Sequence, residues 1–160
     1  MPSVPPGEPF AQRELAFMTE CLNRAVALCR PTLSEAAASC FDRVLVMAWD
    51  WVEGAPVDGD ARTALHRECE RLGKRNAPNR GGRLELYEIA NAATFILGVV
   101  INPINVRYAG VLRHTVPNVL RALFPRDYQS RCEVEQAWQV VATAHLATIG
   151  APSRNCFADM

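Results

Sequence analysis

His66 and Cys69 are the two side chains whose types and spacing come nearest to a metal site. They lie three residues apart on a predicted helix, so both project from one face. A zinc site needs about four protein ligands, or three and a water molecule, and the sequence offers no second clustered pair. We therefore interpret the two as ordinary helix residues and expect neither a metal nor another cofactor.

Cysteine and histidine together could also supply a nucleophile and its base. No flanking motif marks any of them as catalytic, and no C-x-x-C pair is present. We expect most of the cysteines to be free, small apolar core residues rather than a disulfide framework, with Cys156 the most exposed thiol. The cysteines stand at positions 21, 29, 40, 69, 132 and 156, and the histidines at 66, 114 and 145.

Asp50 lies between Trp49 and Trp51. A carboxyl group beside indole rings can have a raised pKa and act as a general acid. Successive helical residues point about 100° apart, however, so we expect one tryptophan in the core and Asp50 at its edge. A single carboxylate without a partner is a weak signal of catalysis.

Lys74 to Arg83 is a basic segment rich in Asn and Gly, and it is predicted to be a loop. Flexible basic loops can hold phosphates, but this one has no G-x-x-x-x-G-K-[ST] order and no aromatic residue for base stacking. A solvated loop is the simpler interpretation. Because loops on a rigid scaffold often carry binding, it is still the best candidate for a functional surface. Its basic residues are Lys74, Arg75, Arg80 and Arg83.

Glu133 and Glu135, with Asp127, make the start of the last predicted helix acidic. The helix dipole favours negative charge there, and the same carboxylates could face a basic partner. We therefore add Glu133 and Glu135 to the four basic residues as the predicted partner-binding side chains.

Length and composition predict one globular domain. The chain has 160 residues, 49% hydrophobic and 21% charged. Lys plus Arg equals Asp plus Glu at 17 each, so net charge gives no general attraction to nucleic acid or anionic lipid. The start of the chain lacks the pattern of a signal peptide, and the longest apolar run, Phe95 to Ile101, is shorter than the ~20 residues of a membrane span. We expect a cytoplasmic protein with no membrane contact.

Apolar residues return every third or fourth position, which predicts an all-α fold, an antiparallel bundle of about six helices. The predicted domain covers residues 10–150, with a flexible leader at 1–9 and a loose tail at 151–160. The expected helices cover residues 10–30, 32–53, 58–73, 84–101, 104–124 and 127–149, with Pro117 kinking or splitting the fifth.

Local signals predict how several of these helices begin and which faces they bury. Thr32 and Glu35 form a T-x-x-E capping box, and Gly54 can end the same helix in a left-handed conformation. The faces expected to be buried contain Leu15, Met18, Leu22, Val26 and Cys29 in the first helix, Phe41, Val44, Leu45, Ala48 and Val52 in the second, Ala61, Leu65, Cys69 and Leu72 in the third, with Arg62 facing out, and Val134, Trp138, Val141, His145 and Thr148 in the last.

Four segments carry a resemblance to a known family: ELAFMTECLNRA (14–25), RVLVMAWDWV (43–52), LELYEIANAATFIL (84–97) and EVEQAW (133–138). In order and pattern they resemble the YjaG-like family of small bacterial helical proteins. The resemblance covers most of the chain but not Lys74 to Arg83. It implies an antiparallel helical bundle and brings no established activity or catalytic residue. In size and style the chain also looks like the small, helical, cytosolic immunity proteins that bacteria encode beside antibacterial toxins.

Three functions follow as hypotheses, in this order. The first is a cytosolic, non-catalytic binding protein, in particular an immunity protein that binds and inhibits a bacterial toxin. The second is an enzyme whose site assembles only in three dimensions from Asp50, His66 or His114. The third is binding of phosphate or nucleic acid through the basic loop 74–83.

Overall fold

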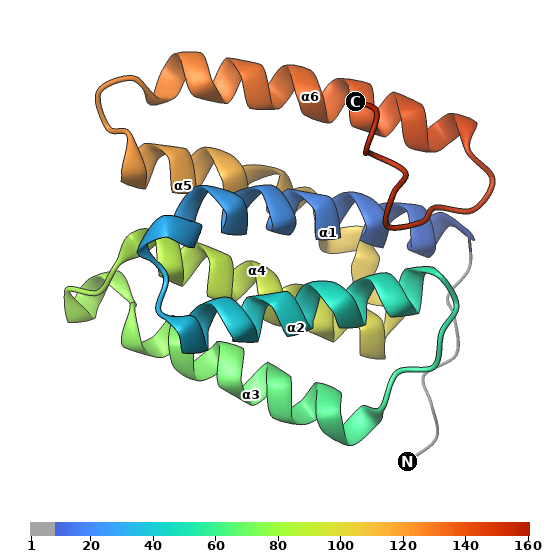
Figure 1. The fold of residues 1–160 in the computed structure, drawn as a ribbon, viewed down its shortest axis with the longest axis horizontal. Coiled ribbons are helices and arrows are strands. Elements are labelled where there is room, and N and C mark those ends of the chain that lie inside the picture. The colour runs from blue at the N-terminus through green and yellow to red at the C-terminus, as the bar shows by residue number, and fades with distance from the viewer. Residues whose placement is uncertain (1–8) are drawn as a thin grey trace.

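Every regular element of the described chain is helical, as the ribbon of the computed structural model shows (Figure 1). The structure describes residues 9–160, except for the side chains of Pro9, Ile104, Tyr108 and Ala109. The predicted leader, residues 1–9, lies outside the described residues apart from Pro9. The α-helices are α1 (Pro9–Cys29), α2 (Glu35–Val52), α3 (Gly59–Arg75), α4 (Leu84–Ile101), α5 (Thr115–Leu123) and α6 (Tyr128–Thr148), and the 3-10 segments are η1 (Arg30–Thr32), η2 (Pro78–Arg80) and η3 (Pro103–His114). The predicted all-α bundle is confirmed.

α4 is the central helix. It contacts α1, α2, α3 and α5, and its buried residues cover more than one face, as expected for a helix with no polar side. Among the described helices it alone is long and apolar enough to cross a membrane. More than half of it is buried inside the protein, and the core helix of a soluble protein has the same composition. Its apolar character is therefore accounted for by packing.

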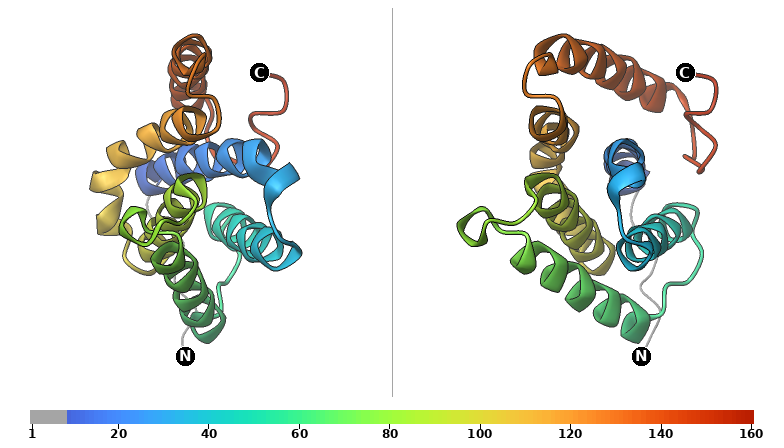
Figure 2. Two further views of the ribbon diagram at one scale, coloured as in Figure 1. Left: turned by 90° about the vertical axis from the view of Figure 1, so that its left-hand side faces the viewer. Right: turned by 60° about the vertical axis from the view of Figure 1, so that its left-hand side comes forward.

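α6 lies at the edge of the bundle opposite α3, where it packs on α5 and more lightly on α1 (Figures 1 and 2). The last ten residues are not a loose tail, because they fold back between α6 and α2. Phe157 is buried with its ring 5.8 Å from Trp138 and 6.4 Å from Trp49, centroid to centroid. The ring nitrogen Nε2 of His145 donates to the Cys156 carbonyl at 2.8 Å. These contacts tie the end of the chain to the bundle.

The predicted capping box at Thr32 is wrong. Thr32 belongs to η1, and its hydroxyl donates to the Cys29 carbonyl at 2.9 Å. Ser34 caps α2 instead, accepting a hydrogen bond from the Ala37 amide at 3.2 Å. The short 3-10 turn around Pro31, η1, therefore places the cap two residues further along the chain. The predicted helix end at Gly54 is confirmed, with φ at +82°.

Pro117 neither kinks nor splits a helix. It is the third residue of α5, in the first turn, where its missing amide leaves no helical hydrogen bond unmade. The predicted helix over 104–124 is α-helical only from Thr115, because the preceding stretch is the 3-10 segment η3.

The buried faces of α1 and α2 follow the predicted patterns, whereas the buried face of α6 differs from the predicted one. The α6 residues buried against the bundle are Glu135, Gln139, Ala142 and Leu146. Val134 and Val141, which we expected inside, are exposed. The helix is rotated from its predicted orientation because polar contacts inside the bundle hold Glu135, as described below.

The first turn of α3 shows a smaller rotation. Leu65 and Cys69 are buried as expected, but Ala61 is exposed and Arg62 is buried. The guanidinium of Arg62 donates to the Thr63 hydroxyl at 3.0 Å, and burial lowers its pKa.

Gly82, in the connection between α3 and α4, has no room for a side chain. A Cβ atom there would lie 2.2 Å from the Cα of Asn76, a backbone atom that cannot give way cheaply. We predict that Gly82→Ala lowers the free energy of unfolding by about 1–3 kcal/mol, as measured by urea denaturation. Gly98, inside α4, meets nothing within 4 Å, so Gly98→Ala is the matched control and should be stabilising by about 0.5–1 kcal/mol. Equal effects of the two substitutions would contradict this packing.

Candidate functional site

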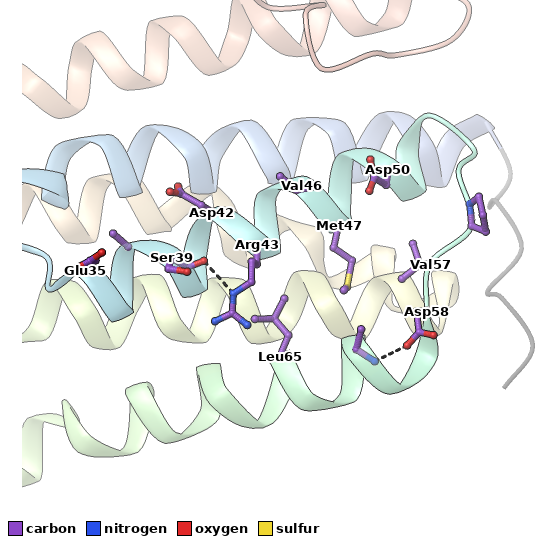
Figure 3. Close-up of a pocket in the computed structure, with 13 residues that line it drawn as sticks. Glu35, Ser39, Asp42, Arg43, Val46, Met47, Asp50, Val57, Asp58 and Leu65 are labelled. Carbon is purple, nitrogen blue, oxygen red and sulfur yellow. Dashed lines mark hydrogen bonds between the residues drawn. The ribbon is translucent and has the colours of Figure 1, made fainter.

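A groove with a volume of about 640 Å³ runs between α2 and α3 (Figure 3). It is formed by the outer face of α2, the connection after α2 and the first half of α3. The lining residues are Glu35, Ala38, Ser39, Asp42, Arg43, Val46, Met47, Asp50, Pro56, Val57, Asp58, Ala61 and Leu65. It is the largest cavity among those described here.

Caps and turns set the two walls of this groove. Ser34 starts α2, and Asp58 starts α3 by accepting a hydrogen bond from the Ala61 amide at 2.6 Å. Gly54 supplies the left-handed turn after α2. Arg43 then crosses from α2 to α3 and donates to both carboxylate oxygens of Glu68, at 2.8 and 2.9 Å. The walls are thus fixed by local sequence and tied together by one ion pair.

Apolar side chains line the interior of the groove. Val57 and Leu65 are almost fully buried, Met47 is half-buried, and Val46 is 53% exposed. A large β-branched side chain half open to water gains free energy when a partner covers it. The groove therefore offers apolar area for binding.

Carboxylates dominate the charge of the groove. Its lining holds Glu35, Asp42, Asp50 and Asp58 but one basic residue, Arg43, so the formal net charge of the lining is −3. The whole chain has a formal net charge of zero. The groove is therefore acidic against a neutral background, which favours a basic ligand.

Two of these carboxylates are already paired at the rim. Asp42 accepts from Arg30 at 2.6 Å, and Asp50 accepts from Arg154 at 2.8 Å. The four side chains are between 39% and 50% exposed, and exposed ion pairs contribute little stability because solvent screens them. A partner's lysine or arginine can therefore replace Arg30 at small cost, whereas Arg154 is also held by Glu53.

Asp50 lies at the edge of the core, as predicted, although both flanking tryptophans are buried rather than one. Arg154 joins it to Glu53, with hydrogen bonds from the arginine that lower the pKa of the Glu53 carboxyl. The tail thus holds one end of the groove.

The four predicted basic residues differ in what they contact. Lys74 and Arg75 are exposed in the last turn of α3, and Arg80 is exposed in η2. Arg83 is engaged within the fold, because its guanidinium donates to Glu85 at 2.7 Å and to the hydroxyl and carbonyl oxygens of Thr32 at 2.7 and 2.9 Å. Arg83 therefore joins η1 to the start of α4.

Arg75 does line a small cavity of about 200 Å³ with Arg71, beside the start of α2. A helix start with two guanidinium groups is a plausible place for an anion. Glu68 also lines this cavity, however, and Ser34 already accepts from the Ala37 amide. The cavity is therefore poorly suited to a phosphate.

Glu135 is not available to a partner in the way we predicted. Its carboxylate is 3% exposed and accepts from Nε and Nη2 of Arg24 on α1, at 2.9 and 2.6 Å. Gln139 donates to the same carboxylate at 3.3 Å, and the Arg24 guanidinium stacks 4.1 Å from the Trp138 ring centroid. Glu135 therefore holds α6 on α1, whereas Glu133 is exposed.

The residues considered for catalysis lie apart. Asp50 lines the groove, and His114 lines a separate cavity of about 460 Å³ with Glu88 and Asn118. His66 lines none of the cavities described here; its Nδ1 lies 3.9 Å from a Glu70 carboxylate oxygen. None of these cavities is lined by two of the three residues. Burial also raises the pKa of Cys21 and of Cys29 to about 12, so both are weak nucleophiles at neutral pH.

His66 and Cys69 point to different surroundings, since Cys69 faces Cys40 with the two sulfur atoms 3.6 Å apart. Within residues 9–160 as described, no group of three or more His, Cys, Asp or Glu side chains could hold a metal ion.

The groove was missed by the sequence reasoning, yet α2 carries a signal for it. Glu35, Asp42 and Asp50 follow one another at seven- and eight-residue spacing, with Ser39 and Val46 between them. Such spacing places all five on one helical face. A face that is both acidic and apolar, on a helix buried on its opposite side, is a signal of a binding surface.

Comparison with known proteins finds no matching family model, no matching curated protein and no matching solved structure. The resemblance to the YjaG-like family therefore stays a prediction.

The Arg24–Glu135 pair gives a testable consequence for stability. Replacing Arg24 by Met keeps most of the side-chain volume but leaves a buried carboxylate without its cation, so we predict a loss of about 2–4 kcal/mol in urea denaturation. The control, Glu133→Gln on the exposed face of α6, should change stability by less than about 0.5 kcal/mol. The double variant Arg24→Met, Glu135→Leu should recover most of the loss. An effect of Arg24→Met as small as that of the control would contradict the assigned role of the pair.

Proposed function

We propose that this protein is a cytoplasmic binding protein whose α2–α3 groove takes up a basic, partly apolar segment of a protein partner. We further propose that the partner is a bacterial toxin and that binding inhibits it, as immunity proteins do. The observation that carries the proposal is the groove itself, with apolar residues along its interior and four carboxylates against one guanidinium in its lining.

The apolar area of the groove and its carboxylates contribute to binding in different ways. Covering Val46 and Met47 removes apolar area from water and supplies affinity. The carboxylates steer a basic partner toward the groove and raise the association rate, more strongly at low salt than at high salt. A basic segment with apolar residues at helical spacing satisfies both properties, because it sets its apolar side inward and its charges at the rim.

A toxin is a suitable partner on chemical grounds. An enzyme that cleaves nucleic acid must present lysine and arginine side chains to phosphates. An acidic surface bound there occupies the substrate's place. The groove is built from two capped helices, so little ordering free energy is lost when the partner binds.

Val46 gives the sharpest test of this proposal, because it is the exposed valine of the groove lining. We predict that Val46→Lys, which removes apolar contact and adds a positive charge, weakens binding of the partner at least ~10-fold, since about 1.4 kcal/mol corresponds to that factor. The matched control is Val141→Lys on α6, where valine is 57% exposed and lies outside the groove.

The measurement is a calorimetric titration at two salt concentrations, with the purified product of a gene that flanks this one taken as the candidate toxin. The wild type and Val141→Lys should bind equally, and both should weaken as salt rises. Cells that express the toxin should grow with the wild type or Val141→Lys and stop growing with Val46→Lys. Equal binding and equal protection by both variants would refute the groove as the site. No complex and no protection by the wild type would refute the toxin as the partner.

A further inference from the structure

Cys40 on α2 and Cys69 on α3 bring two thiols together outside the groove lining. Their sulfur atoms are 3.6 Å apart, and both residues have no exposed surface. The two positions are 29 residues apart in sequence and belong to the two helices that form the groove walls. The fold thus brings two thiols into contact at the junction of these walls.

The surroundings distinguish Cys40 from the other cysteines. Its contact with Cys69 lowers the pKa of Cys40 and raises that of Cys69. Burial raises the pKa of the remaining four, Cys21, Cys29, Cys132 and Cys156. A cysteine with a lowered pKa supplies more thiolate, which is the form that attacks a disulfide. Cys40 is therefore the favoured attacking group.

We propose that Cys40 and Cys69 are an oxidative modification site, at which a small disulfide of the glutathione class converts the thiol pair into an intramolecular disulfide. This inference stands apart from the proposed toxin binding, because it concerns the two helices and not their ligand.

The reaction balances in two exchange steps. The Cys40 thiolate attacks one sulfur of oxidised glutathione, forms a mixed disulfide and releases one glutathione thiolate. The Cys69 thiol gives its proton to the released glutathione thiolate, attacks the Cys40 sulfur, forms the Cys40–Cys69 bond and releases the second glutathione. The protein loses two electrons and two protons, and oxidised glutathione becomes two molecules of reduced glutathione. The sulfur atoms must approach from 3.6 Å to about 2.0 Å for the bond to form.

Access to the buried pair comes through local opening of α3. This helix lies at the edge of the bundle (Figure 2), and its tie to α2 near the thiols is the Arg43–Glu68 pair, whose side chains are 53% and 37% exposed. Exposed ion pairs contribute little stability, and edge helices open more readily than core helices. Transient separation of α3 from α2 therefore exposes Cys40 to the oxidant.

The experiment is disulfide mapping of the wild-type protein after incubation with oxidised glutathione, compared with the reduced protein. Trypsin releases Cys69 in the peptide 68–71, and Cys40 in the peptide 25–43, because the Arg30–Pro31 bond resists cleavage. The second peptide also contains Cys29, so fragment ions must locate the linked sulfur. We expect a monomer two hydrogen atoms lighter, with Cys40 linked to Cys69. The linked protein should melt higher by about 5 °C or more, since the bond closes a long loop in the unfolded chain.

Other outcomes overturn the proposal. These are a link that involves Cys29, glutathione left on Cys132 or Cys156 with no Cys40–Cys69 bond, or no reaction at all. Labelling with N-ethylmaleimide in parallel shows whether the two thiols become reachable; if they are labelled but not linked, the pair is not a disulfide site. Cys156→Ala is the control variant and should keep the link, whereas Cys69→Ala should lose it. Disulfide mapping of the wild-type protein shows whether the Cys40–Cys69 bond forms even if a variant does not fold.

Discussion

α4 must bury apolar side chains on more than one face, and this constraint organises the rest of the molecule. Four helices contact α4, and α3 packs on α4 more extensively than on α2. Two helices that share a central neighbour need not close fully on one another, so α2 and α3 leave a groove on the outer side. The position of the groove thus follows from how the helices pack on the core. The side chains on the outer face of α2 determine its chemical character.

Charge is distributed according to burial. The pair whose carboxylate is buried, Glu135 with Arg24, is made of two short hydrogen bonds and is completed by Gln139 and the Trp138 ring. The pairs at the groove rim are exposed and exchangeable. The first kind fixes the position of α6, because separating a buried carboxylate from its cation is costly. The exposed pairs at the rim let a cation of a partner compete for the groove carboxylates, as binding of a basic partner requires.

Local signals allowed most of the fold to be predicted, and non-local contacts account for the errors. Prolines, glycines and apolar spacing fixed the order of the helices and the span of α4 from Leu84 to Ile101. The orientation of α6 could not be predicted from hydrophobic spacing, which places Val134 and Val141 on the buried face. The helix instead buries Glu135, because this carboxylate binds Arg24, a residue 111 positions away in the sequence. The groove was missed for the same reason: the spacing of Glu35, Asp42 and Asp50 gives one wall, but the gap requires the position of α3 relative to α2.

The central claim is that the α2–α3 groove is the surface by which this protein acts. Hydrogen–deuterium exchange of the complex with its partner, compared with the free protein, tests it most directly. The groove predicts slower exchange in residues 35–65 on binding, with α6 and the basic residues 74–83 unchanged. Protection confined to α6 or to residues 74–83, with residues 35–65 unaffected, would contradict it.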